Sequence, residues 1–173
     1  MNGFILLLPF FFIRFVVLAF LDKASLQRAA MFAPLKGNEK PAYYIYQLTN
    51  AGIILYPFFL TVKPALSPFF LLGLICYLLG LLLCLVTVAA FASPDENGLN
   101  TDGIYRFSRN PMYVSYFFCF LGIALLTRSL LLLGVVLPFQ VSGHFIILSE
   151  ERWCREKFGA AYEEYCRKAR RYI

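Results

Sequence analysis

Charged residues are scarce in this sequence, and several chemical groups are missing. Asp, Glu, Lys and Arg make up only 15% of its 173 residues, against about 25% in ordinary soluble domains. Histidine occurs once, and none of the five cysteines forms a C-x-x-C pair. The sequence therefore indicates neither a metal site nor a disulfide framework. It also contains no glycine-rich loop of the kind that binds dinucleotide phosphates.

Apolar residues dominate the chain instead. They account for 60% of it, and aromatic residues for 18%. A soluble domain of about 150 residues leaves about 30% of its chain surface in water, which is too much for so apolar a sequence. The net charge is +6, but the basic residues cluster at the ends of apolar segments. That pattern is typical of membrane orientation and not of nucleic-acid binding, so we expect an integral membrane protein in contact with the lipid bilayer.

Five apolar segments predict transmembrane helices. They are residues 3–21, 42–62, 66–92, 111–127 and 129–149. The charged tail, residues 150–168, carries apolar residues at helical spacing and predicts an amphipathic helix at the membrane surface. The expected fold class is an all-α integral membrane protein of about five transmembrane helices with a cytosolic amphipathic C-terminal helix. We expect residues 1–173 to form one membrane-embedded domain, with a three-helix part (1–92) followed by a loop, a helical hairpin and the tail (93–173).

The basic residues predict the orientation. Of the 16 Lys and Arg residues, 13 lie in segments 22–41, 93–110 and 150–173, which share one side if there are five spans. Only Lys63 and Arg128 lie on the other side, and Arg14 lies inside the first segment. Because basic residues concentrate in cytoplasmic loops, we expect the N-terminus outside and the C-terminus in the cytosol.

Polar residues gather in two blocks on the predicted cytosolic side. The first, residues 97–113, reads NGLNTDGIYRFSRNPMY, and the second begins with Glu150 and Glu151. By itself, the first block also fits a connecting loop that ends with Pro111 in the first turn of a helix. The second by itself fits a solvated acidic pair beside Arg152.

Together the blocks resemble a known enzyme family. The first is similar to the L-V-T-x-G-x-Y-x-x-x-R-H-P-x-Y signature of the isoprenylcysteine carboxyl methyltransferase family, from Leu99 to Tyr113. The second is similar to that family's E-E-x6-F-G-x-x-Y-x-x-Y, from Glu150 to Tyr165, and the ending R-Y-I is similar to its closing residues. The same membrane fold occurs in phospholipid N-methyltransferases and, more remotely, in sterol reductases.

This resemblance implies methyl transfer from S-adenosylmethionine to a hydrophobic or lipid-linked acceptor. A guanidinium such as that of Arg109 suits the carboxylate of this cofactor, and Glu150 suits its ammonium group. The residues that the resemblance implies for cofactor binding are Asn97, Gly98, Leu99, Asn100, Tyr105, Arg109, Asn110 and Glu150.

Two departures from the family pattern bear on the acceptor. Asn110 stands where the signature has His, and Ile146 stands where prenylcysteine enzymes place an Arg that meets the substrate carboxylate. We therefore expect a neutral acceptor, such as a lipid amine or a thiol, and poor methylation of prenylcysteine carboxylates. His144 is the one candidate for a base at neutral pH, although a lone His in a membrane helix more often bonds a neighbouring helix, so the catalytic residues stay unassigned.

Two alternatives remain open at the level of the sequence. A sterol-reductase-like enzyme would use NADPH, and a non-catalytic membrane scaffold or small transporter would explain the apolar runs. The sequence contains no visible dinucleotide-binding loop for a reductase, and a scaffold or transporter would not explain the two polar blocks.

Overall fold

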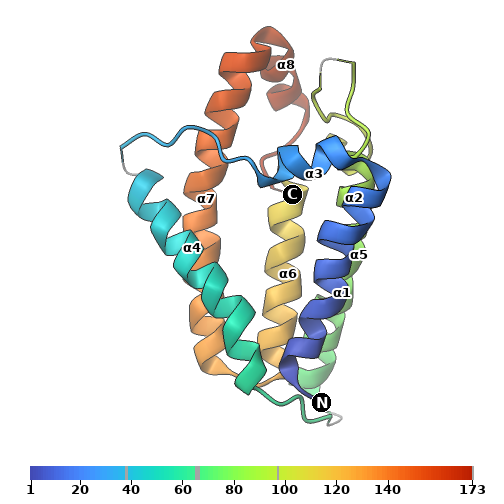
Figure 1. The fold of residues 1–173 in the computed structure, drawn as a ribbon, viewed down its shortest axis with the longest axis vertical. Coiled ribbons are helices and arrows are strands. Elements are labelled where there is room, and N and C mark those ends of the chain that lie inside the picture. Colours follow the sequence, from blue (N-terminus) through green and yellow to red (C-terminus); the bar gives the residue numbers. More distant parts are fainter. Residues whose placement is uncertain (38, 65–66, 97, 173) are drawn as a thin grey trace.

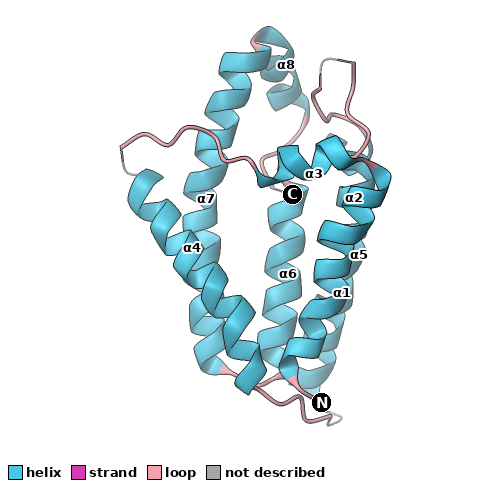
Figure 2. Cartoon of the chain, in the orientation of Figure 1, coloured by secondary structure: helices cyan, strands magenta, loops and turns pink. Residues whose placement is uncertain are grey.

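Helices make up the regular structure of the computed structural model. It describes residues 1–37, 39–64, 67–96 and 98–172, and these ranges contain helices and connecting segments but no β-strand (Figure 2). The all-helical fold class predicted from the apolar runs is confirmed for this part of the chain.

The first apolar segment forms one helical rod whose hydrogen-bond pattern changes along its length. Its parts are the 3₁₀ turn η1 (Gly3–Leu6), α1 (Leu7–Phe11), the π-helical η2 (Phe12–Val17) and α2 (Leu18–Leu21). The remaining elements are α3 (Lys23–Ala30), α4 (Glu39–Leu55), η3 (Tyr56–Phe59), α5 (Pro68–Phe91), η4 (Gly103–Arg106), α6 (Pro111–Leu126), α7 (Leu130–Phe158) and α8 (Ala160–Lys168).

The long helices run side by side along the long axis of the molecule (Figure 1). Helix α5 packs most extensively on α6, and α4 packs on α7. The first rod lies against α5, and α6 also contacts α7. Large buried side chains such as Phe139, Leu18 and Ile123 fill the space between these helices.

The two ends of the bundle differ in character. At one end the backbone of Gly3 bonds Leu60 at 2.8 Å, and Arg128 donates to Ser67 at 3.0 Å. At the other end lie α3, the loop before α6, the end of α7, and α8 (Figure 1). This second end collects the three basic segments that the sequence assigns to one side.

Among the described residues, three helices are long and apolar enough to cross a membrane: Gly3–Leu21, Pro68–Phe91 and Leu130–Phe158. Helix α6 is apolar but has only 16 residues, a length of about 24 Å against about 30 Å of hydrocarbon. Helix α4, with 17 residues, does not belong to the set of three. The integral membrane character is supported, whereas the five-span count stays a prediction.

Two expected boundaries are wrong. The fifth helix does not end at Ser149, because α7 continues through Glu150 and Glu151 to Phe158, and only Gly159 at φ 54° interrupts it. The charged residues after position 149 mark a change of surroundings, but they are compatible with a helix. The second helix ends at Leu55 and not near residue 62, because a 3₁₀ turn that contains Pro57 follows it.

The contact between α5 and α6 depends on two glycines. A Cβ atom at Gly80 would collide with the backbone of Cys119, and one at Gly122 with the backbone of Tyr77.

We expect Gly80→Ala to lower the free energy of unfolding by about 1–3 kcal/mol, because backbone atoms must shift. Gly134→Ala, where nothing lies within 4 Å, is the control and should be neutral or slightly stabilising. Thermal unfolding followed by a thiol-reactive dye on the buried cysteines would measure both, and equal stability of the two variants would contradict the close approach.

Candidate functional site

One cavity of about 540 Å³ lies at the polar end of the bundle. Its walls come from the first rod, α3 and the segment after it, α4, α6, α7, α8 and the loop that follows α5. Of the eight residues that the resemblance implies for cofactor binding, Asn97 lies outside the described residues. The other seven all line this cavity: Gly98, Leu99, Asn100, Tyr105, Arg109, Asn110 and Glu150. Segments far apart in the sequence therefore meet in one place.

Glu150 contributes a carboxylate to the cavity wall. Its Oε1 accepts a hydrogen bond of 2.9 Å from the hydroxyl of Tyr113 on α6. The side chain is partly buried, and no Lys or Arg among the described residues forms an ion pair with it. A carboxylate in an apolar wall with one neutral partner is suited to a cationic ligand.

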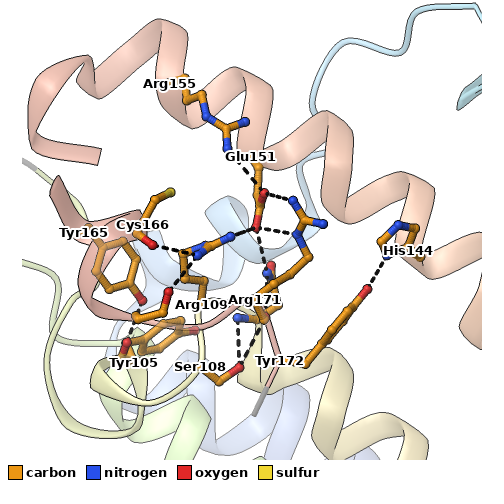
Figure 3. Close-up of polar contacts among 12 residues, drawn as sticks. Tyr105, Ser108, Arg109, His144, Glu151, Arg155, Tyr165, Cys166, Arg171 and Tyr172 are labelled. Carbon is orange, nitrogen blue, oxygen red and sulfur yellow. Dashed lines mark hydrogen bonds and ion pairs between the residues drawn. The ribbon is translucent and has the colours of Figure 1, made fainter. Parts of the chain in front are cut away.

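Glu151 behaves differently, although it is the next residue on α7. It is 2% exposed and accepts hydrogen bonds from Arg109 at 2.9 Å and from Arg171 at 2.9 Å (Figure 3). Arg155 lies 3.7 Å away on the same helix, and Asn110 is also within reach. Glu151 therefore joins α7 to the loop before α6 and to the C-terminal segment.

The guanidinium of Arg109 is directed into the protein. Besides Glu151, it bonds the carbonyl oxygens of Cys166 at 3.3 Å and Ala169 at 2.7 Å (Figure 3). Burial by itself would lower the pKa of Arg109, but the bonds and the charge of Glu151 outweigh it and raise that pKa. Since its donors are used in this way, Arg109 has no free pair of N–H groups with which to grip a carboxylate.

The loop after α5 is shaped by its own hydrogen bonds. Gly98 adopts φ +84° and donates to the carbonyl of Asp95 at 2.9 Å, while Leu99 donates to the side chain of Asp95 at 2.7 Å. Asn100 donates to the carbonyl of Ala90 at 2.9 Å, near the end of α5. These bonds fix the loop against the cavity and leave the backbone of Gly98 without a side chain in the way.

Tyr105 and helix α8 form one side of the cavity. The hydroxyl of Tyr165 donates to the carbonyl of Tyr105 at 2.7 Å. Tyr105, Tyr162 and Tyr165 are all buried, and burial raises the pKa of each phenol. These hydroxyls are therefore neutral hydrogen-bond donors at physiological pH.

Asn110 connects the loop to the chain terminus. Its side-chain nitrogen donates to the carbonyl of Arg171 at 3.1 Å. Next to it, the backbone of Arg109 donates to the carbonyl of Arg170 at 2.8 Å. The neutral amide at this position therefore helps to hold the C-terminal segment over the site.

Two residues singled out by the sequence lie outside the lining of the cavity. The Nδ1 atom of His144 lies 2.5 Å from the hydroxyl of Tyr172, which ties α7 to the C-terminal segment (Figure 3). Ile146 is 0% exposed and belongs to the hydrophobic core. Ile146 offers no charge to the cavity, and the poor methylation of a prenylcysteine carboxylate stays a prediction.

Several cavity residues were missed by the sequence analysis. They belong to the N-terminal half or to the last turns of α7, and include Arg14, Arg28, Tyr46, Trp153 and Lys157. Only Arg14 had a visible signal, since it is a charge inside an apolar run. Its position inside the first segment was noted, but the sequence did not connect it with the two polar blocks.

The comparisons with known proteins agree with this picture. The phospholipid methyltransferase family matches residues 69–161, more than half of the chain. The chain belongs to this family. No curated protein and no solved structure matches significantly. The matched region begins in α5 and ends in α8, so it contains the loop, α6 and α7 of the cavity but not the first rod. The family predicted from the two polar blocks is confirmed, and membership in it implies a membrane methyltransferase.

Proposed function

We propose that this protein transfers a methyl group from S-adenosylmethionine to the amine of a membrane lipid. Family membership supports the reaction type. The observation that carries the proposal is the cavity with the unpaired carboxylate of Glu150 in its wall. Its volume of about 540 Å³ lies in the range of about 300–1,000 Å³ that is typical of ligand sites.

The residues of the cavity fit the proposed cofactor. S-adenosylmethionine supplies an already activated methyl group on a sulfonium, together with an ammonium and a carboxylate. The carboxylate of Glu150 binds a cationic group, and Tyr113 orients that carboxylate. The loop at Gly98 offers backbone to a ligand at close range. The positions Asn100, Tyr105 and Asn110 shape this wall through their bonds to α5, α8 and the terminus.

Arg109 acts on the site through Glu151. Its guanidinium holds Glu151 and the end of α8 in place, so we propose it as a positioning residue. With the C-terminal segment fixed in this way, Tyr162 and Tyr165 cover the cavity and exclude water. Because the donor methyl is activated, the contribution of the protein is mainly the alignment of donor and acceptor.

The acceptor is proposed from the family description and from the lining. The family acts on phospholipids by its description, and the cavity is bounded largely by apolar and aromatic side chains such as Phe32, Tyr46 and Phe158. We expect a lipid amine to be methylated well and a farnesylcysteine carboxylate poorly.

A direct test separates the proposal from the alternatives. The protein in nanodiscs would be incubated with radiolabelled S-adenosylmethionine or with NADPH, and binding would be measured. Transfer of label to phosphatidylethanolamine, to farnesylcysteine or to small thiols would then identify the acceptor. Binding of NADPH alone would favour a reductase, and binding of neither would favour a non-catalytic role.

The proposed membrane arrangement has five crossings, with the N-terminus outside and the C-terminus cytosolic. Lys36 and the tail belong to the polar end of the bundle, while Lys63 lies near the N-terminus at the other end. We expect a membrane-impermeant maleimide added to intact cells to label Lys63→Cys and not Lys36→Cys, in a variant of the protein that lacks Cys154 and Cys166. Labelling of both positions from one side would exclude the five-span arrangement.

A further inference from the structure

Arg14 lines the cavity and carries a buried nitrogen without a hydrogen-bond partner among the described residues. The residue is only 9% exposed, lies in the π-helical turn Phe12–Val17, and lines the cavity. Its Nε donates to the hydroxyl of Tyr116 on α6, and its Nη2 donates to the carbonyl of Ala29 at 3.0 Å. Its Nη1 is buried without a hydrogen-bond partner among the described residues.

An unpaired nitrogen on a buried guanidinium is costly for a protein, because it has lost water and gained nothing in return. A buried group of this kind calls for a specific explanation, such as a functional role, and π-helical turns are frequent at functional sites. The two bonds to Tyr116 and Ala29 hold the side chain from two different elements. The free N–H groups are therefore fixed in position before a ligand arrives.

The other cations of the cavity are already engaged. Arg28 donates to the carbonyl of Phe91 at 2.9 Å and lies over its ring. Arg109 holds Glu151, and Lys157 lies 4.7 Å from the ring of Trp153. Among the described cavity residues, Arg14 is the cation with a buried nitrogen still to be satisfied.

Arg14 and Glu150 both line the cavity, and each forms a hydrogen bond with a tyrosine of α6. Tyr116 holds Arg14 and Tyr113 holds Glu150. These tyrosines lie one turn apart on α6, with ring centroids separated by 6.2 Å. A positive group and a negative group, each held by a tyrosine of α6, therefore line the same cavity.

We propose that Arg14 and Glu150 form a subsite for a zwitterionic group, in which Nη1 of Arg14 binds an oxyanion and Glu150 binds the neighbouring ammonium. This inference rests on the proposed function and names a further specificity residue for it. Two ligands of that function carry this chemistry: the amino-acid end of S-adenosylmethionine, with its carboxylate, and the phosphoethanolamine group of a lipid acceptor, with its phosphate.

The test compares wild type, Arg14→Gln and the control Arg106→Gln, which changes an exposed arginine at the same end of the bundle. In the first arm, the dissociation constants of S-adenosylmethionine and of its decarboxylated analogue are measured in nanodiscs. If the oxyanion is the cofactor carboxylate, wild type and Arg106→Gln prefer the intact cofactor by at least tenfold, and Arg14→Gln loses this preference. The wild-type preference needs no variant and is informative even if Arg14→Gln fails to fold.

In the second arm, the Michaelis constant is measured for phosphatidylethanolamine and for a long-chain alkylamine without phosphate, at saturating cofactor. If the oxyanion is the lipid phosphate, Arg14→Gln raises the constant for phosphatidylethanolamine at least tenfold and leaves that for the alkylamine unchanged. Either pattern supports the subsite. Binding and turnover that depend neither on the ligand's oxyanion nor on Arg14 overturn it, while a wild type that binds no cofactor overturns the proposed function itself.

Discussion

Replacing Glu151 with glutamine is expected to destabilise the polar end of the bundle strongly. The carboxylate is 2% exposed and is the shared partner of Arg109, Arg171 and Arg155. Glutamine keeps one acceptor oxygen but loses the charge, so two close guanidinium groups remain without a counter-ion. Removing one partner of a buried ion pair costs about 3–5 kcal/mol. For a chain of this size the melting temperature should fall by roughly 10 °C.

Thermal unfolding in detergent, followed by the exposure of buried cysteines, would measure this loss. Glu164→Gln is the matched control, because its salt bridge to Lys168 lies at the surface with a side-chain exposure of 62%. Exposed pairs contribute about 0–1 kcal/mol, so this control should melt close to wild type. A melting temperature of Glu151→Gln equal to that of the control would show that the three arginines do not depend on this carboxylate.

Much of the fold follows from the sequence because long apolar runs leave few choices. In a bilayer every backbone group must be satisfied within its own segment, which favours helices, and each apolar run does contain one. The tight connection between α6 and α7 was also expected, because the predicted segments 111–127 and 129–149 are separated by one residue. The end of the fifth helix was not, because the sequence shows where the surroundings change and not where the helix stops. That stop depends on the conformation of Gly159.

Only part of the candidate site could be predicted from the sequence. Seven of its eight predicted residues line one cavity because they belong to two contiguous blocks with a recognisable order. The different roles of Glu150 and Glu151 could not be predicted from the sequence, because the two residues are identical and adjacent. Those roles depend on α7 meeting Tyr113 on one side and Arg109 on the other. The place of Arg14 in the cavity could not be predicted for the same reason, since its neighbours in space come from α3 and α6.

Glu150→Gln is expected to separate ligand binding from stability. Glutamine can still accept the hydrogen bond of Tyr113 through its amide oxygen. In the described part of the chain, no arginine pairs with Glu150 and would lose its partner. The variant should therefore fold and melt like wild type. A cationic ligand group would lose its counter-charge in a poorly solvated wall, and hydrogen bonds to charged groups contribute about 1.5–3 kcal/mol. The dissociation constant of S-adenosylmethionine should then rise by at least about tenfold.

Equilibrium binding of the labelled cofactor in nanodiscs would measure this effect, at a temperature where every variant is folded. Glu156→Gln is the control on the same helix, since its side chain is 59% exposed and pairs with Lys36 at 3.5 Å. Glu151→Gln, once folded, should weaken binding much less than Glu150→Gln because its carboxylate is turned to the arginines. Tyr113→Phe keeps the carboxylate of Glu150 and loses only its orienting hydroxyl, so it should fall between wild type and Glu150→Gln. Equal losses for the two adjacent glutamates would mean that neither carboxylate distinguishes the ligand. No loss in Glu150→Gln would remove the cation-binding role assigned to Glu150.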